Sequence, residues 1–297
     1  MENNDTLEVI QRIPLDKLRP YPDHPFGVRD DDMMQQTVES IKQFGVLVPG
    51  IARPLPDGTF ELIAGHRRKQ ASAVAGLDDM PIIVRDIDRN AATIIMVDSN
   101  LQRENILPSE KAFAYKMKLD AMKRQGVRTD LTSDPLGQKL KGKYSIEMLA
   151  EEAAESKTQV QRYIRLTYLI PEILEMVDNS VLKEKDKLQI ALRPAVELSY
   201  LTEQEQRDLN ETMMTEDRTP SHAQAIKMRK FSQDGRLNMD VIFSIMQEEK
   251  GNQKEQFKIP RDRISKYFAP GTPAQKIEDT IVKALELYQK RQRSLQR

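Results

Sequence analysis

The sequence predicts an α+β N-terminal domain, then an all-α domain with a helix-turn-helix, then a small, mainly helical C-terminal unit. Over the first hundred residues, short apolar runs bounded by turn residues alternate with helical periodicity. Residues 168–250 are helical and charged in pattern, with no strand signal. Aromatic residues make up 5% of the chain and Trp is absent, which favours helix-rich packing of Leu, Ile, Ala and Met.

The composition excludes several classes of site. A chain of 297 residues can bury the cores of two or three domains. Lys and Arg number 46, as do Asp and Glu, so any DNA binding requires a local basic patch. The absence of Cys excludes disulfides, thiolate zinc sites and thiol nucleophiles, and fits a cytoplasmic protein. The His residues lack metal-ligand spacing, and neither a signal peptide nor a membrane partner is expected.

The first domain, residues 1–107, is predicted to mix strands and helices. The predicted strands are 7–13, 48–53, 59–64 and 81–85, the second and third joined by the turn Pro54-Leu55-Pro56-Asp57-Gly58. The predicted helices are 32–44, 66–75 and 91–102, with Gly45 and Gly76 ending the first two.

The second domain, residues 108–250, is predicted to be helical. Pro108 suits the first position of a helix that runs to about Arg124, with Gly126 as its stop. Residues 125–144 then form a predicted hinge, which together with the end of that helix carries a local excess of Lys and Arg. This basic stretch suits DNA, although a solvated linker would carry the same charges.

The third unit, residues 251–297, is predicted to be mainly helical. A strand or short helix is expected at 257–267. The sequence Thr272-Pro273-Ala274-Gln275 then suits a helix start. A helix follows with four apolar side chains on one face, at Ile277, Ile281, Leu285 and Tyr288. The stripe is short for a coiled coil, so the unit is a candidate for dimerisation rather than a clear zipper.

The first candidate binding residues are Gly65, His66, Arg67 and Arg68, which lie between an apolar strand and a helix. Glycine lets a backbone N–H approach a ligand closely, and the N–H groups of a helix start favour an anion. Two guanidinium groups add paired donors for phosphate oxygens. The pattern is neither a Walker A motif nor G-x-G-x-x-G, so a surface helix with solvated Arg is an alternative, as is a packing role for His66.

A second candidate stretch contains Ser99, Asn100 and Arg103 at the end of a predicted helix. Asn100 offers a carbonyl oxygen suited to Mg²⁺ or to a nucleotide, and Arg103 offers another phosphate donor. An ordinary helix C-terminal cap would use the same residue types.

A helix-turn-helix is predicted at about 145–167. Ser145 and Ser156 can cap its two helices, and Ala154 occupies the turn position that more often holds Gly. The second helix presents polar side chains able to read base edges and hold phosphates, namely Ser156, Lys157, Thr158, Gln159, Gln161 and Arg162. The alternative is an ordinary helical hairpin with a polar outer face.

In this order, the motifs resemble those of the ParB partition proteins. That family has a Gly-Glu-Arg-Arg box, similar to residues 65–68, and a Glu-Asn-Leu-Gln-Arg segment, similar to residues 99–103. A helix-turn-helix and a C-terminal dimerisation unit follow, and the resemblance covers roughly residues 8–230.

The resemblance implies a ParB-like nucleotide-binding domain that binds CTP with Mg²⁺, and a homodimer that loads at an inverted-repeat DNA site and closes into a sliding clamp. Gly65, Arg67 and Arg68 would hold the triphosphate, while Asn100 and Arg103 would contact Mg²⁺ and phosphate. The implied role is segregation of a chromosome, plasmid or mobile element in the cytoplasm, on nucleoid or plasmid DNA. The family expectation also includes slow CTP hydrolysis.

The sequence departs from the family pattern in ways that bear on these roles. His66 and Ser99 replace the two family Glu residues, the second of which is tied to metal and hydrolysis, so we expect nucleotide binding with weak or altered hydrolysis. Asp98 is a neighbouring carboxylate, but adjacent helical residues point about 100° apart. Val48 replaces a family Gln, and the family's Gly-His-Ala-Arg segment appears as residues 193–196, so base selectivity and the second DNA contact are expected to differ.

Family members often stimulate a ParA-type ATPase through a basic N-terminal tail, but this chain begins acidic, so any such contact is expected to use another surface. The runner-up function is a helix-turn-helix transcriptional regulator without a nucleotide switch. The N-terminal pattern also resembles sulfiredoxin, whose chemistry the absence of Cys excludes. No carboxylate or His cluster suits a metal-dependent nuclease.

Overall fold

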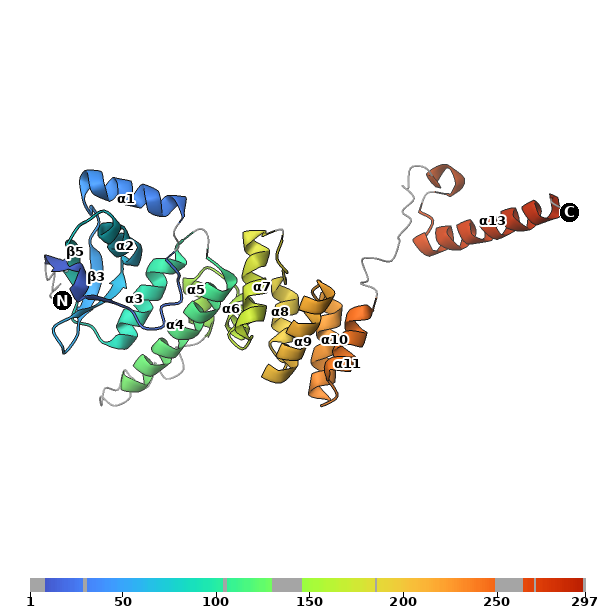
Figure 1. Ribbon diagram of the computed structural model, residues 1–297. Helices are drawn as coiled ribbons and strands as arrows, with labels where there is room; N and C mark the ends of the chain where they lie inside the picture. The colour runs from blue at the N-terminus through green and yellow to red at the C-terminus, as the bar shows by residue number, and fades with distance from the viewer. Residues whose placement is uncertain are drawn as a thin grey trace. The chain divides into compact units, whose positions relative to one another are not determined.

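The computed structural model describes residues 9–28, 31–103, 106–129, 146–184, 186–248, 264–269 and 271–295. The chain divides into two compact units, Met1–Glu248 and Glu249–Arg297. Along the first unit, a sheet with its covering helices is followed by a run of helices (Figure 1).

The N-terminal part is built on a mixed five-stranded sheet. Its strands are β1 Ile10–Pro14, β2 Leu18–Pro20, β3 Gly50–Pro54, β4 Phe60–Ala64 and β5 Asp79–Val84, with a 3-10 turn η1 at Leu15–Lys17. The order across the sheet is β1-β5-β3-β4-β2. The β1–β5 and β3–β4 pairs are antiparallel, whereas β3–β5 and β2–β4 are parallel.

Alternating side chains of β4 place apolar groups on both faces of this sheet. Leu62 joins the cluster formed with Ala52 and Ile82, and Ile63 joins the cluster formed with Met96 and Val97. Because successive strand residues point to opposite faces, a single apolar run lines two cores. The sheet is thus buried on both sides, and its loops position the candidate site.

Helices α2 His66–Val74 and α3 Arg89–Leu101 pack against this sheet, and α1 Asp32–Phe44 packs against α2. Two of them begin at aspartate caps, because Asp31 accepts from the Met34 N–H at 2.9 Å and Asp88 accepts from the Ala91 N–H at 2.8 Å. Helix α1 ends at Gly45, whose φ of 70° only glycine adopts readily. The three helices coincide with the predicted ones to within two residues.

The long helix α4, Pro108–Thr129, contributes to three separate cores. Ala112 packs with the helical part of the chain, Ala114 with the sheet, and Tyr115 with the two helices that follow. The prediction that Gly126 would stop this helix is wrong, since the helix continues through it. A glycine inside a helix costs about 1 kcal/mol and does not by itself end the hydrogen-bond ladder.

The next two helices are α5 Ile146–Glu152 and α6 Lys157–Leu166, which lie where the helix-turn-helix is predicted. Ser145, the predicted cap of the first, lies outside the described residues, as does most of the predicted basic hinge. Ala154, in the turn, has a φ of 52°. The turn therefore has a left-handed backbone at the position that more often holds Gly.

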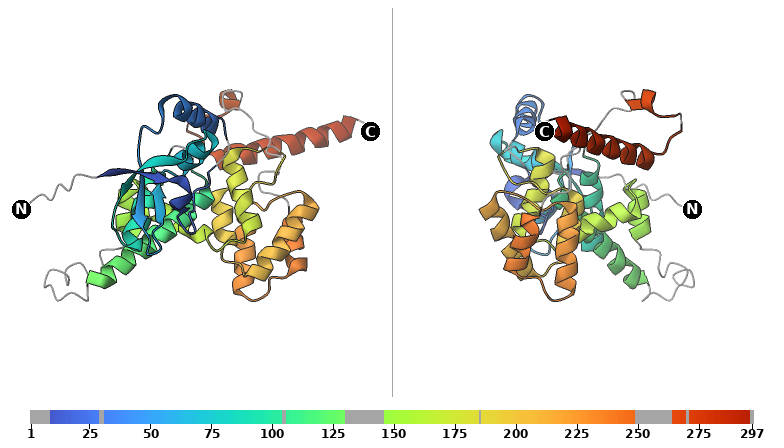
Figure 2. Two further views of the ribbon diagram at one scale, coloured as in Figure 1. Left: turned by 60° about the vertical axis from the view of Figure 1, so that its left-hand side comes forward. Right: turned by 90° about the vertical axis from the view of Figure 1, so that its right-hand side faces the viewer.

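Five further helices form a bundle (Figure 2). They are α7 Pro171–Leu182, α8 Leu192–Leu198, α9 Glu203–Glu216, α10 His222–Gln233 and α11 Met239–Gln247. Two begin with capping boxes, at Thr202 with Glu205 and at Ser221 with Gln224. This confirms the prediction of a helical, strand-free stretch after the helix-turn-helix for the residues that the structure describes.

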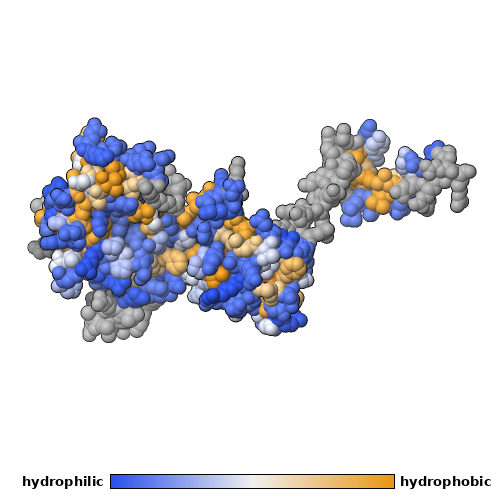
Figure 3. Space-filling model, viewed as in Figure 1, coloured by the Kyte–Doolittle hydropathy of each residue, from blue (hydrophilic) through white to orange (hydrophobic). Residues whose placement is uncertain are grey.

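The second unit contains the 3-10 turn η4 Ser265–Tyr267 and the helix α13 Ala274–Leu295. Figure 3 shows apolar side chains gathered along this helix, where Val282, Leu285 and Tyr288 are exposed. Most of the predicted element at 257–267 lies outside the described residues. Among the helices that the structure describes, none combines the length and apolarity needed to cross a bilayer.

Candidate functional site

Helix α2 begins at Gly65 with a geometry suited to an anion. Gly65 has a φ of 108° and no side chain to cap the first turn, and the Lys69 N–H donates to its carbonyl at 2.9 Å. A Cβ added to Gly65 would lie 3.2 Å from the Gly50 Cα. The glycine therefore permits both the left-handed turn and the close approach of β3, and it leaves first-turn N–H groups for an external acceptor.

The two arginines that follow, Arg67 and Arg68, are already held by nearby protein groups. Arg67 forms an ion pair with the Asp31 carboxylate, while its Nε is buried without a hydrogen-bond partner. Arg68 donates from Nη1 to the carbonyls of Val48 and Pro49, the second at 2.7 Å. Burial lowers the pKa of Arg68. Each guanidinium has five N–H donors, so both Arg residues retain donors for a phosphate after these contacts.

His66, the first residue of α2, lies beside these arginines and is a neutral base. Its Nε2 accepts from the Tyr21 N–H at 3.4 Å, and its ring centroid lies 4.2 Å from that of His24. Burial, followed by the positive charges of His24, Lys69 and Arg103, lowers the pKa of His66 to about 3. The ring is thus neutral near pH 7 with Nε2 as acceptor, which assigns the proton to Nδ1.

Ser99 and Asn100 both turn back onto their own helix. The Ser99 hydroxyl donates to the Met96 carbonyl at 2.9 Å, and the Asn100 amide donates to the same carbonyl at 2.8 Å. Asn100 is buried, with 4% of its surface exposed. This geometry leaves the Asn100 Oδ1 and the Ser99 hydroxyl oxygen able to act as oxygen ligands.

The donor set fits only a Mg²⁺ ion that a nucleotide supplies. No group of three His, Cys, Asp or Glu residues in the described part of the chain could hold a metal. Mg²⁺ usually keeps several waters and binds through one or two protein ligands together with substrate phosphates. Asn100 and Ser99 could supply such neutral oxygen ligands, but they do not form a metal site by themselves.

The loop between β2 and α1 brings the two predicted stretches together. His24 contacts His66 and also packs edge-on against Phe26, with ring centroids 5.7 Å apart. The Arg103 guanidinium lies 5.9 Å from the Phe26 ring centroid, and its charge lowers the pKa of His66. Gly65–Arg68 and Arg103 therefore share one electropositive site, whereas Ser99 and Asn100 lie on α3 just before it.

Sequence reasoning missed the residues that line this connection. No motif in the sequence singles out Tyr21, His24, Phe26 or Asp31. Their roles depend on contacts with residues at least 36 positions away in the chain. The signal available in the sequence was the pair of His residues, but spacing alone does not show that the rings touch.

On α6, the predicted DNA-contacting residues lie at and after a capped helix start. The Gln159 N–H donates to the Ser156 hydroxyl at 3.2 Å, which caps the helix. Val160 is fully buried against α4 and α5, so the opposite face is turned outward. Ser156, Lys157, Thr158 and Gln161 are exposed, while Gln159 and Arg162 are half-buried. Lys157 also pairs with Glu147 of α5.

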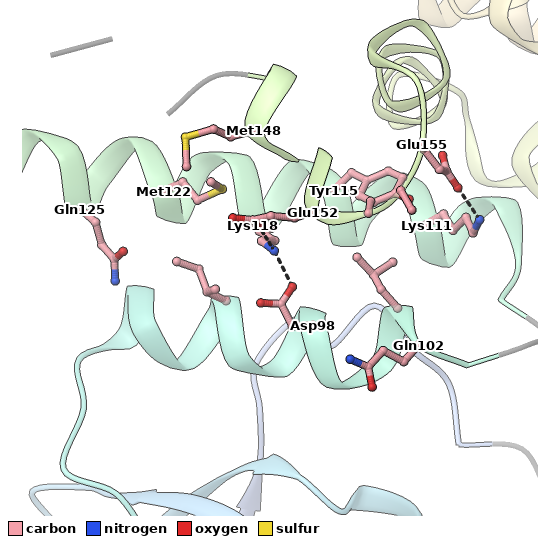
Figure 4. A pocket seen from close by; sticks show the side chains of 14 residues that line it. Asp98, Gln102, Lys111, Tyr115, Lys118, Met122, Gln125, Met148, Glu152 and Glu155 are labelled. Carbon is pink, nitrogen blue, oxygen red and sulfur yellow. Dashed lines mark hydrogen bonds and ion pairs between the residues drawn. The ribbon is translucent and has the colours of Figure 1, made fainter. Parts of the chain in front are cut away.

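A cavity of about 670 Å³ lies between α3, α4 and α5, apart from the candidate anion site (Figure 4). Lys118 reaches from α4 to Asp98 of α3 at 2.5 Å and to Glu152 of α5 at 2.6 Å. The Asp98 carboxylate is thereby held in an ion pair with Lys118 of α4. This geometry argues against Asp98 as a substitute for the carboxylate that Ser99 replaces.

Comparisons with known proteins show which sequences this chain resembles. Residues 1–101 match the sequence model of the ParB N-terminal domain. The chain is 32% identical over 170 residues to the chromosome-partitioning protein Spo0J of Thermus thermophilus, covering 57% of this chain and 55% of that protein. It is 29% identical over 251 residues to the nucleoid occlusion protein of a Geobacillus species, covering 82% of this chain and 81% of that one.

The chain is also similar to solved structures of C-terminally truncated ParB from Caulobacter crescentus. In complex with the centromeric parS site, that protein is 21% identical, with a TM-score of 0.41, and the match covers 75% of this chain and 99% of that one. In complex with CTP-gamma-S, it is 24% identical, with a TM-score of 0.30, and covers 69% and 99%. In sequence, residues 1–101 thus match the ParB N-terminal domain, and the chain is similar to chromosome-partitioning and nucleoid occlusion proteins.

Proposed function

We propose that this protein is a sequence-specific DNA-binding partition protein whose hold on DNA is switched by CTP. The observation that carries the proposal is the meeting of Gly65–Arg68 with Arg103 around the open N-terminus of α2. A triphosphate needs several cations and free N–H donors, and this site supplies both. The match to the ParB N-terminal domain supports the same assignment.

In the proposed nucleotide site, first-turn N–H groups of α2 and the guanidiniums of Arg67, Arg68 and Arg103 bind the phosphates. His66, as a neutral Nδ1 donor, adds no negative charge against them. Mg²⁺, carried by the nucleotide, would take Asn100 and Ser99 as neutral oxygen ligands and spread the phosphate charge. CTP rather than another nucleotide is the choice that the family resemblance favours.

In the proposed DNA site, α6 enters the major groove. Gln161 and Arg162 suit base edges, while Ser156, Lys157, Thr158 and Gln159 near the helix start suit phosphates or base edges. The protein is proposed to act as a homodimer on an inverted-repeat site, so that two copies of α6 read matching half-sites. Residues 251–297 are the candidate dimerisation unit because α13 exposes an apolar stripe.

The proposed activity is a switch rather than fast catalysis. Ser99 stands where the family carboxylate is tied to metal and hydrolysis, and Asp98 is bound to Lys118. CTP hydrolysis is therefore expected to be slow. A ParA-type ATPase is a proposed partner, and the protein is placed on chromosomal, plasmid or mobile-element DNA in the cytoplasm.

The second candidate is a helix-turn-helix regulator without nucleotide switching. One feature favours it: Arg67, Arg68 and the Asn100 amide are each held by protein groups. A site closed upon itself in this way could stabilise the fold without a ligand. Nucleotide binding decides between the two functions.

The test is calorimetric titration of the full chain with CTP, ATP, GTP and UTP in the presence of Mg²⁺. CTP-selective binding is expected, and it should be lost in Arg68→Ala and in Arg103→Ala. Arg12→Ala is the matched control, because Arg12 is an exposed guanidinium paired with Asp79 on β5. Thermal unfolding of each variant separates a lost ligand contact from a lost fold.

Binding of no nucleotide, with or without DNA, would remove the switch and leave the regulator. The DNA site is tested by selecting duplexes from a random pool. Arg162→Ala is expected to weaken the selected duplex by about 1–3 kcal/mol if Arg162 contacts a base. Equal affinity for selected and scrambled duplexes would remove α6 from the reading role.

A further inference from the structure

Next to the end of α6, three cations and two tyrosine rings stack alternately, in a set that we call the Arg–Tyr ladder: Lys116, Tyr168, Arg165, Tyr200 and Arg229. The Lys116 Nζ lies 5.3 Å from the Tyr168 ring centroid, and the Arg165 Cζ lies 4.4 Å from the same centroid. On Tyr200, the Cζ atoms of Arg165 and Arg229 lie 3.9 and 3.6 Å from the centroid. All four distances are within the range of cation–π attraction.

The ladder carries unbalanced positive charge. Arg229 pairs with Glu197 at 2.9 Å, whereas Lys116 and Arg165 form no ion pair with any described residue. Glu203 borders the adjacent cleft, but it pairs with Arg207. Because both guanidiniums lie against one ring, they are within roughly 8 Å of each other, about one Debye length at physiological ionic strength. Glu197 offsets the charge of Arg229 alone, so the charges of Lys116 and Arg165 remain to attract an external anion.

The ladder is held in place by bonds that leave its outer surface open. Arg165 donates from Nε to the Ser199 hydroxyl at 3.0 Å and from Nη2 to the Ser199 carbonyl at 2.7 Å. The buried Gln206 amide donates to the Tyr168 carbonyl at 3.0 Å, which fixes the backbone beneath that ring. Tyr168 and Tyr200 are 56% and 40% exposed, beside a cleft of about 430 Å³.

These contacts favour a phosphate over a nucleic-acid base as the ligand. Stacking of a base requires a free aromatic face. Tyr200 has two guanidiniums against its ring, and Tyr168 has a guanidinium and an ammonium against its own. What the ladder offers to the outside is the N–H groups of its cations, which match phosphate oxygens.

The ladder continues the outer face of α6. Thr158, Gln161 and Arg165 are spaced three and four residues apart, so they share one side of the helix. The rise from Thr158 to Arg165 is about 10 Å, close to the ~12 Å width of the major groove. A side chain at that distance from the base-reading end of a helix in the groove lies at the groove edge, where the phosphates run.

We propose that the Arg–Tyr ladder binds the phosphate backbone of duplex DNA beside the bases that α6 reads. This inference rests on the proposed DNA-binding function and adds a second contact that the resemblance to the family did not supply. The ladder contributes affinity and orientation, whereas Gln161 and Arg162 contribute sequence selectivity.

The experiment measures binding of the full chain to a selected target duplex and to a scrambled duplex over a series of salt concentrations. In Arg229→Ala, affinity for both duplexes should fall by the same factor, roughly three- to tenfold, and the slope of log K against log salt should shrink by about 1. Arg229→Lys should keep that slope because it keeps the charge. Glu197→Gln removes the counter-charge and should strengthen binding to both duplexes, a gain that a merely structural role would not give.

Arg236→Ala is the matched control, because Arg236 also stacks on a single ring, that of Phe231 at 5.3 Å, and pairs with Asp234 outside the ladder. It should leave affinity and salt slope unchanged. If Arg162→Ala loses selectivity while Arg229→Ala matches wild type, the ladder proposal is overturned and the DNA-binding function stands. If the wild-type chain binds neither duplex, the DNA-binding function itself fails and the ladder proposal fails with it.

Discussion

Replacing Lys118 by Met should reveal the energetic role of the ion pairs that join α3, α4 and α5. The Lys118 side chain is 3% exposed, and its Nζ lies 2.5 Å from Asp98 and 2.6 Å from Glu152. Removing one partner of a buried ion pair costs about 3–5 kcal/mol when the other charge stays buried. Both carboxylates are 46% exposed and can regain water, so we expect the lower end.

A second contribution comes from the two carboxylates that the substitution leaves behind. Both contact one nitrogen, so they lie within roughly 5 Å of each other, and their repulsion is about 1 kcal/mol in water and several-fold larger near a protein surface. Methionine retains the apolar stem and limits the loss of packing. Together these effects predict a loss of about 4 kcal/mol in the free energy of unfolding.

The assay is urea unfolding followed by far-ultraviolet circular dichroism, which suits a chain without Trp. Lys42→Met is the matched control, because Lys42 makes an exposed ion pair with Glu39 and should change stability by less than about 1 kcal/mol. Adding Asp98→Asn and Glu152→Gln to Lys118→Met should restore most of the lost stability. A Lys118→Met variant within about 0.5 kcal/mol of wild type would refute the reasoning.

Three further outcomes follow from local geometry. Stability should fall as pH drops from about 6.5 toward 3, by up to ~1.4 kcal/mol per pH unit, because the unfolded chain takes a proton that folded His66, with its pKa of about 3, does not. When unfolding is measured across that pH range, His66→Gln should flatten the slope of stability against pH. An unchanged slope would contradict the assignment of the shifted pKa to His66. Gly65→Ala should lower stability by about 1–3 kcal/mol in thermal unfolding, and by more than the control Gly58→Ala. Both glycines have positive φ, but of the two only Gly65 has neighbours within 4 Å of the added Cβ. Equal losses of stability would count against the close approach of β3 to Gly65. Ser156→Ala should cost about 1 kcal/mol through the lost cap of α6, measured by the same method, and no loss would mean that the cap is not formed in solution.

Elements with a strong local signal could be predicted from the sequence. Helix α1 coincides with the predicted 32–44 because Asp31 and Gly45 punctuate both ends and the apolar spacing between them is helical. The β3–β4 hairpin was predicted from Asp57-Gly58, although β3 begins at Gly50 rather than at Val48. Strand β2 was not predicted, because its pairing with β4 is a long-range contact and its three residues, which include Pro20, carry no local strand signal.

Only part of the candidate site could be predicted from the sequence. Cations after a glycine are a local pattern, so Gly65–Arg68 could be singled out. That Arg67 pairs with Asp31, and that His24 and Phe26 connect His66 to Arg103, depends on how distant segments pack. The assignments of these residues to nucleotide, metal and DNA remain predictions, since they depend on ligands rather than on the fold.

Helix α4 also limits how this chain could be recombined with its relatives. Ala112, Ala114 and Tyr115 pack into three different cores within a single turn of the helix. A crossover between residues 107 and 108 would therefore pair α4 with a foreign sheet core, while the helix kept its partners in the other two cores. Functional chimeras should tolerate junctions after Glu248, where the compact unit ends, far better than junctions at the start of α4. The segments that can be exchanged between relatives are then determined by which residues share a hydrophobic core, and not by the domain boundaries that sequence motifs suggest.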